Sequence, residues 1–110
     1  MRRARTYSPQ ALNAARVLGL RIAEGRRERR WTQAELSERA GISRVTLGHA
    51  ERGEPTVQIG LMFELATLVG VELFGVPANQ LGSIVDRERD RLALLPAHVY
   101  RKRGKADDDF

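Results

Sequence analysis

Residues 31–53, WTQAELSERAGISRVTLGHAERG, decide the fold that the sequence predicts. Thr32 and Glu35 have the spacing of a capping box, in which each side chain bonds the backbone amide of the other, so a helix begins here. Gly41 ends that helix, because glycine adopts a positive φ without a Cβ penalty. Ser43 is a second N-cap. The pattern therefore predicts two short helices joined by a tight turn at Gly41.

Helical periodicity continues on both sides of this pair. Ser8 is a cap and Pro9 a favoured first residue for a long helix that we expect to reach about Arg29. Gly19 is expected to be its weak point, because glycine costs about 1 kcal/mol relative to alanine in a helix. Thr56 is expected to cap a further helix whose apolar residues cover most of its circumference. The predicted fold class is all-α, a bundle of four to five helices.

The chain after residue 70 is less regular. Residues 71–76, VELFGV, alternate well enough for a short strand or an extended connector. Another helix is expected from Pro77 to near Pro96, and the basic and then acidic run that follows is expected to be disordered. The predicted organisation is a basic arm (1–7), a helical domain (8–70), a strand and helix extension (71–96) and a tail (97–110).

Charge is distributed unevenly along the chain, whose net charge is +5. Residues 1–52 contain 12 arginines, no lysine and 5 glutamates, whereas no lysine or arginine lies between residues 53 and 86. A surface that binds phosphates needs cations close to it. The N-terminal half is therefore expected to face a polyanion, and the middle of the chain to serve another purpose.

Composition argues against several classes of protein. The chain has no cysteine, which removes disulfides, thiolate ligands and thiol nucleophiles. It has no apolar run near 18 residues and no secretory signal, so we expect a cytoplasmic protein with no membrane partner. The sequence shows no nucleophile paired with a base, no metal-binding cluster and no phosphate-binding glycine loop. We therefore expect no enzyme activity, cofactor, metal or small-molecule ligand.

Residues 24–71 resemble the lambda-repressor-like DNA-binding domain of the Xre/Cro family. The elements TQAEL, AGIS and ERG, at their mutual spacing, carry this resemblance. Two positions depart from the family pattern, since Ser37 stands where alanine is usual and Ala50 where a larger apolar residue is usual. The resemblance implies a helix-turn-helix whose second helix lies in the major groove of double-stranded DNA.

The resemblance and the geometry of DNA together indicate which residues contact it. Base contacts are expected from Arg44, which can bind guanine, from Val45, which can touch a thymine methyl, and from His49. Phosphate contacts are expected from Gln33, Ser43, Thr46, Arg27 and Arg30. For each, the alternative is an exposed side chain without a DNA role. For Arg2, Arg3 and Arg5 a basic terminus is favoured over an arm in the minor groove.

Two further roles concern charged residues near the motif. The resemblance implies an inward ion pair between Arg26 and Glu51, against the alternative of a surface pair worth under about 1 kcal/mol. A metal site at His49 is disfavoured, because the chain offers only one other histidine and no cysteine.

The resulting hypothesis is a repressor that binds an inverted-repeat operator as a homodimer, because one recognition helix reads only a few base pairs. The dimer is inferred from the helix after Thr56, which is apolar on more than one side. The expected interface comprises Met62, Phe63, Val71, Leu73, Leu81 and Ile84.

Within the family, the run TVQIGLMFELATLVGVELF is similar to HipB-type antitoxins, which pair strands across their dimer. This similarity implies a HipA-type kinase toxin as partner, with the tail that ends at Phe110 as a docking or degradation segment. A phage-type or restriction-controller repressor explains the motif equally well. An adapter for protein or RNA without operator specificity is a further alternative.

Overall fold

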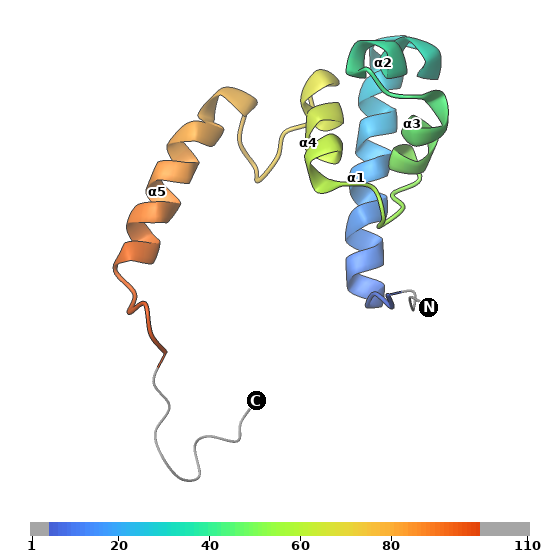
Figure 1. The fold of residues 1–110 in the computed structure, drawn as a ribbon. Helices are drawn as coiled ribbons and strands as arrows, with labels where there is room; N and C mark the ends of the chain where they lie inside the picture. The colour runs from blue at the N-terminus through green and yellow to red at the C-terminus, as the bar shows by residue number, and fades with distance from the viewer. Residues whose placement is uncertain (1–4, 100–110) are drawn as a thin grey trace. The chain divides into compact units, whose positions relative to one another are not determined.

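The computed structural model describes residues 5–99 and consists of helices, turns and loops (Figure 1). Its elements in chain order are α1 (Pro9–Glu28), α2 (Gln33–Ala40), α3 (Arg44–Glu51), α4 (Ile59–Leu68), the short 3₁₀ helix η1 (Ala78–Gln80) and α5 (Leu81–Ala93). The all-α fold class predicted from the sequence is confirmed. The chain divides into two units, Met1–Ala78 and Asn79–Phe110, which are described separately.

Helices α1 to α4 of the first unit pack around one small core. Figure 1 shows α1 between α3 and α4, with α2 at the C-terminal end of α1. Burying each large apolar side chain of the core contributes about 1.5–3 kcal/mol. The side chains with almost no exposed surface are Ile22, Leu36, Leu47, Leu65 and Val69.

Helix α1 begins where the sequence predicts, and its packing accounts for the glycine at position 19. Ser8 caps α1 by accepting a hydrogen bond from the amide of Ala11 (3.1 Å). Gly19 was expected to weaken α1. The structure shows that packing requires a glycine at this position. A Cβ atom there would lie 2.6 Å from the carbonyl oxygens of Ala50 and Glu51. The backbones of α1 and the end of α3 therefore touch, and only glycine permits this approach.

The start of α4 differs from the prediction. Thr56 was expected to cap this helix, but the N-cap is Gln58, and its side chain makes no capping hydrogen bond. The reason is a turn closed by a hydrogen bond from the amide of Val57 to the carbonyl of Glu54 (3.1 Å), which places Thr56 before the helix. Met62 of α4 is only 5% exposed. It belongs to the core of its own unit, so it has too little free surface for the expected dimer contact.

Residues 71–76 form a tight turn where a short strand was one expectation. Within residues 5–99 the only bridge of the β type joins Leu73 to Val76, whose amide donates to the Leu73 carbonyl at 3.3 Å. Phe74 and Gly75 both have positive φ, 58° and 77°, as in a type I′ turn. The chain therefore reverses before it can form a strand. Phe74 is 76% exposed, and its ring meets that of Phe63 edge to face at 6.1 Å between centroids.

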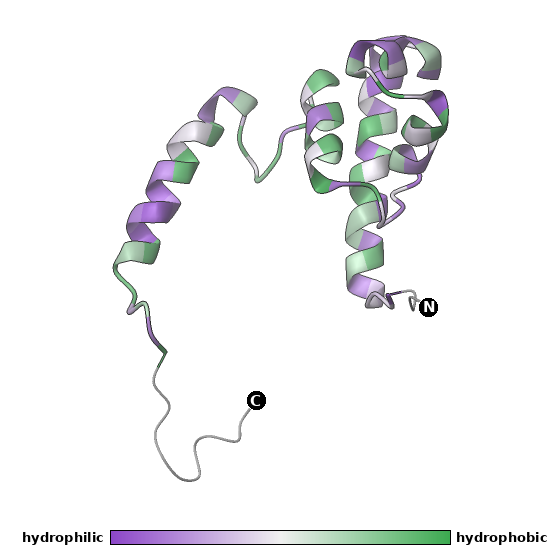
Figure 2. Cartoon of the chain, in the orientation of Figure 1, coloured by the Kyte–Doolittle hydropathy of each residue, from purple (hydrophilic) through white to green (hydrophobic). Residues whose placement is uncertain are grey.

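The second unit contains α5, in which a run of six charged residues, Asp86–Arg91, lies between apolar residues at both ends. The expected helix from Pro77 begins later, at Leu81 after η1, and ends at Ala93, three residues before Pro96. Figure 2 shows a hydrophilic middle and apolar ends for α5. Its apolar residues recur at helical spacing, and none is buried: Leu81, Ile84, Val85 and Leu92. In the part of the chain that the structure describes, none of the helices has the length and apolar character needed to cross a bilayer.

Candidate nucleic-acid interface

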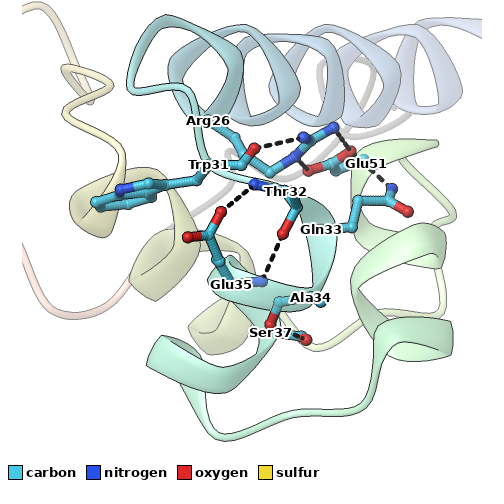
Figure 3. Close-up of polar contacts among 8 residues, drawn as sticks. All are labelled: Arg26, Trp31, Thr32, Gln33, Ala34, Glu35, Ser37 and Glu51. Carbon is cyan, nitrogen blue, oxygen red and sulfur yellow. Dashed lines mark hydrogen bonds and ion pairs between the residues drawn. The ribbon is translucent and has the colours of Figure 1, made fainter.

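The start of α2 is fixed by the capping box that the sequence predicts. The amide of Glu35 donates to Thr32 Oγ1 (3.0 Å), and the amide of Thr32 donates to Glu35 Oε1 (2.8 Å; Figure 3). The hydrogen bond from the Thr32 backbone is the main reason that the pKa of Glu35 lies below its ordinary value. Trp31 stacks beneath the Arg39 guanidinium, 4.1 Å from the ring centroid. These contacts hold the N-terminus of α2 in one orientation.

The turn between α2 and α3 is made by Gly41, as the sequence predicts. Its φ is 71°, and a Cβ there would meet no other atom within 4 Å. The requirement for glycine is thus conformational rather than steric. Ser37, one of the two departures from the family pattern, is buried, and its hydroxyl donates to the Ala34 carbonyl (2.9 Å; Figure 3). The buried hydroxyl is therefore satisfied within its own helix.

A buried ion pair connects α1 to the end of α3. Arg26 Nε donates to Glu51 Oε2 (2.6 Å), Arg26 Nη2 donates to Oε1 (3.1 Å), and Nη1 donates to the Trp31 carbonyl (2.9 Å; Figure 3). Arg26 is 8% exposed and Glu51 is 9% exposed. The inward pair expected from the sequence is present. Two parallel hydrogen bonds fix the relative geometry of the helices, as bidentate arginine–carboxylate pairs do.

Gln33, at the first turn of α2, is held by this ion pair. Its Nε2 donates to Glu51 Oε1 at 3.1 Å, and Figure 3 shows Gln33 and Arg26 on opposite sides of the Glu51 carboxylate. The carboxylate uses one of the two amide hydrogens, so the second remains available. Gln33 thus lies at a helix N-terminus, where the dipole favours an anion, in an orientation that α1 and α3 determine.

The outward face of α3 carries a large exposed apolar side chain between two arginines. Val45 is 69% exposed, and Arg44 and Arg52 are exposed as well. These three line a shallow hollow together with Gly48 and Gln33. The structure therefore brings together Gln33, Arg44 and Val45, which the sequence proposed for DNA contact. It also adds Arg52, which sequence reasoning missed, although its spacing of eight residues from Arg44 places it on the same helix face.

The hydroxyl groups at the start of α3 are engaged with each other. The amide of Thr46 donates to Ser43 Oγ (3.0 Å), so Ser43 caps the helix. The Ser43 hydroxyl in turn donates to Thr46 Oγ1 (3.0 Å). The Thr46 hydroxyl keeps its own proton for an external acceptor, and Ser43 remains exposed.

A second charged cluster lies at the C-terminal end of α3. His49 Nδ1 is 2.8 Å from Glu54 Oε2, Arg52 Nε is 3.1 Å from the same oxygen, and Arg52 Nη2 is 3.0 Å from His49 Nδ1. The hydrogen bond from His49 is the largest cause that lowers the pKa of Glu54, with Arg52 contributing less. Of these residues the sequence singled out only His49.

The remaining candidates lie at several places on the chain. Arg27 and Arg30 are exposed near the start of α2, and Arg30 has an unusual positive φ of 59°. Arg5 is exposed, whereas Arg2, Arg3, Phe110 and most of the expected disordered tail lie outside the described residues. No group of three or more histidine, aspartate or glutamate side chains within residues 5–99 could hold a metal ion.

Comparison with known proteins agrees with this geometry. A family model described as "Helix-turn-helix" matches residues 22–76, which are half of the chain. The HTH-type transcriptional regulator SutR of Escherichia coli (strain K12) is 25% identical over 91 residues, which cover 80% of this chain and 51% of SutR. The chain thus spans about half the length of this curated relative. No solved structure matches. The chain belongs to the helix-turn-helix family, whose motif places a helix in the major groove of DNA.

Proposed function

We propose that the protein is a sequence-specific DNA-binding transcriptional regulator in which α3 is the recognition helix. The proposal rests on one observation: Val45, on the outward face of α3, is 69% exposed and lines one hollow with Arg44 and Arg52. An apolar side chain in this position gains contact when a thymine methyl covers it, and an arginine beside it can bind guanine through two hydrogen bonds. We assign base contacts to Arg44, Val45 and His49.

Phosphate contacts would fix the orientation of α3 in the groove. Gln33, with an amide hydrogen left over from its bond to Glu51, presents a donor at the N-terminus of α2. Thr46 and Ser43 at the start of α3, and Arg27 and Arg30 at the end of α1, complete the proposed set. Contacts of this kind determine register on the duplex without reading its sequence.

The test is selection of a binding site from randomised double-stranded DNA, followed by titration of the selected and scrambled duplexes. Specific binding should exceed binding to scrambled DNA by about a thousandfold or more at physiological salt. An adapter for protein or RNA that uses the same fold would select nothing. Equal affinity for all duplexes would therefore overturn the proposal.

We infer further that the protein binds DNA as a homodimer on an inverted repeat, with half-sites about 34–36 Å apart or a multiple of this distance. Two exposed apolar features support the inference. One is Phe74, which is exposed and whose ring packs on that of the half-buried Phe63 of α4. The other is on α5, where Val85 and Leu92 are exposed and Leu81 and Ile84, proposed at the interface, are half-buried. Val71 and Leu73, also proposed at the interface, are half-buried and keep some free surface.

Operator binding also implies a biological setting. We propose repression by exclusion of polymerase in the cytoplasm, and the antitoxin of a HipBA-like module as a specific form of it, with a HipA-like kinase as partner. The antitoxin form depends on a pairing strand after α4, and Leu73–Val76 form a tight turn instead. A phage-type or restriction-controller repressor is therefore an equal alternative. A kinase-like open reading frame next to this gene would favour the antitoxin.

A further inference from the structure

Glu54 lies just after α3 and contacts two side chains of that helix. Its Oε2 atom is 2.8 Å from His49 Nδ1 and 3.1 Å from Arg52 Nε. The backbone strengthens this position, because the amide of Glu54 donates to the carbonyl of His49 (3.1 Å). His49 and Glu54 are each about 40% exposed, so the cluster is formed at the surface. One carboxylate oxygen therefore orients the side chains of His49, in the last turn of α3, and of Arg52, its C-cap residue.

The His49 ring cannot satisfy both of its neighbours at once. Its Nδ1 is close to Glu54, which only accepts when ionised, and is also 3.0 Å from Arg52 Nη2, which only donates. A ring nitrogen either carries a proton or offers a lone pair. The proton on Nδ1 is favoured by geometry, because the contact of Nδ1 with Glu54 (2.8 Å) is the shorter of the two and Arg52 can donate to Glu54 instead. Arg52 keeps its own hydrogen bond to Glu54 through Nε.

The tautomer determines what the opposite nitrogen of the ring can recognise. With the proton on Nδ1, Nε2 of a neutral ring is an acceptor. In the major groove the complementary donors are the amino groups of adenine and cytosine. If Nδ1 instead accepted from Arg52, Nε2 would carry the proton and would match the acceptors of guanine or the O4 of thymine.

We propose that Glu54 is a positioning residue for DNA recognition, which holds the His49 ring as an acceptor toward the bases and Arg52 beside it. This inference rests on the proposed function of α3, and it assigns a role to a residue that does not itself contact DNA. It identifies the chemistry read by the last turn of α3 as an exocyclic amino group. Glu54 therefore influences base preference through His49.

The experiment compares the full-length protein with its Glu54→Ala variant on the selected DNA site and on all its single-base variants. All measurements are made at one pH, 8. The parent should prefer adenine or cytosine at one position of each half-site. Glu54→Ala should change the preference at that position by about five- to tenfold in favour of guanine or thymine, the size expected of one hydrogen bond. Glu24→Ala, an exposed carboxylate of α1, is the control for loss of charge.

A double-variant comparison separates positioning from a general effect of charge or stability. If Glu54 acts through His49, Glu54→Ala should change no relative base preference in a His49→Ala background. An equal change in affinity for every duplex, as expected for loss of a repulsive charge alone, would overturn the inference and leave the proposed function intact. Failure of the parent to select any sequence would overturn both. Unfolding midpoints of all variants show whether each one is folded.

Discussion

Arg26 and Glu51 meet through two parallel hydrogen bonds in the buried space between α1 and the end of α3. Gln33 adds a third bond to the same carboxylate from the start of α2. Three helices are thus connected at one point, close to the face of α3 that we propose for DNA contact. Because neither charge has free access to water, each depends on the other.

Removing one member of this pair should strongly destabilise the fold. Arg26→Ala and Glu51→Ala each leave an unpaired buried charge, and we expect the free energy of unfolding to fall by about 3–5 kcal/mol. Replacing both by apolar residues, Arg26→Met with Glu51→Leu, should cost less than either single change. Denaturant titration measures all three. A loss under about 1 kcal/mol for the single variants would contradict the role assigned to the pair.

Gly19→Ala should destabilise the protein although alanine is the better helix former. The added Cβ would lie 2.6 Å from two backbone oxygens of α3. We expect thermal unfolding to show a net loss of about 1–3 kcal/mol, the range for forced overpacking. The matched control is Gly60→Ala in α4, where a Cβ meets nothing within 4 Å. The control should leave stability unchanged or raise it by up to about 1 kcal/mol. The same effect at both glycines would show that packing at Gly19 is unimportant.

Arg44→Ala should weaken binding to the selected DNA site and broaden base preference at one position. The expected cost is about 1–3 kcal/mol, the worth of a bidentate contact to guanine. Fluorescence anisotropy on single-base variants of the site measures both quantities. The control is Arg21→Ala on α1, which removes the same charge from the side of α1 that borders Val69 and Gly70. Equal losses for the two variants would indicate a general charge effect.

The exposed apolar residues predict self-association. Analytical ultracentrifugation at micromolar concentration should show a dimer of the 12.4 kDa chain. Phe74→Ser and Val85→Glu should each shift the equilibrium toward monomer, because they remove exposed apolar surface without changing the core. A parent protein that is monomeric at these concentrations would refute the homodimer.

Stability should decline on acidification, in part because of Glu35. Hydrogen bonds from Thr32 lower the pKa of Glu35 in the folded state below its ordinary value of 4.5. The unfolded chain therefore binds a proton at higher pH than the folded chain does. The contribution of Glu35 is complete above the unfolded pKa and is lost as pH falls through the folded pKa. Unfolding midpoints between pH 6 and pH 3 should depend less on pH in Glu35→Gln than in the parent, and identical profiles would argue against the capping contribution.

Local chemistry explains what the sequence predicted well. Helix caps and tight turns depend on residues within four positions of one another, so spacing alone reveals them. The caps at Ser8, Thr32 and Ser43 and the turn at Gly41 are of this kind. The partnership of Arg26 with Glu51 is not local, and only the family resemblance indicated it before the structure showed it.

The predictions that failed for Gly19 and Met62 depended on contacts between distant segments. Gly19 appeared to be a weak point because the carbonyl groups that it touches lie more than 30 positions later in the chain. Met62 was placed at a dimer interface because periodicity cannot show which apolar side faces the core. Arg52 and Glu54 lie within five positions of His49, but the sequence does not show that their side chains turn toward its ring.

The contact of Gly19 with the end of α3 has a consequence for how a protein of this kind acquires a new target. Peptide atoms at this contact, together with the buried pair of Arg26 and Glu51, set the angle between α1 and α3. Exchanging the outward residues of α3 therefore changes which bases are bonded while the helix keeps its direction. Under the proposed function, divergence toward another operator would need only a few substitutions, at the proposed base contacts Arg44, Val45 and His49 and at the residues that orient them.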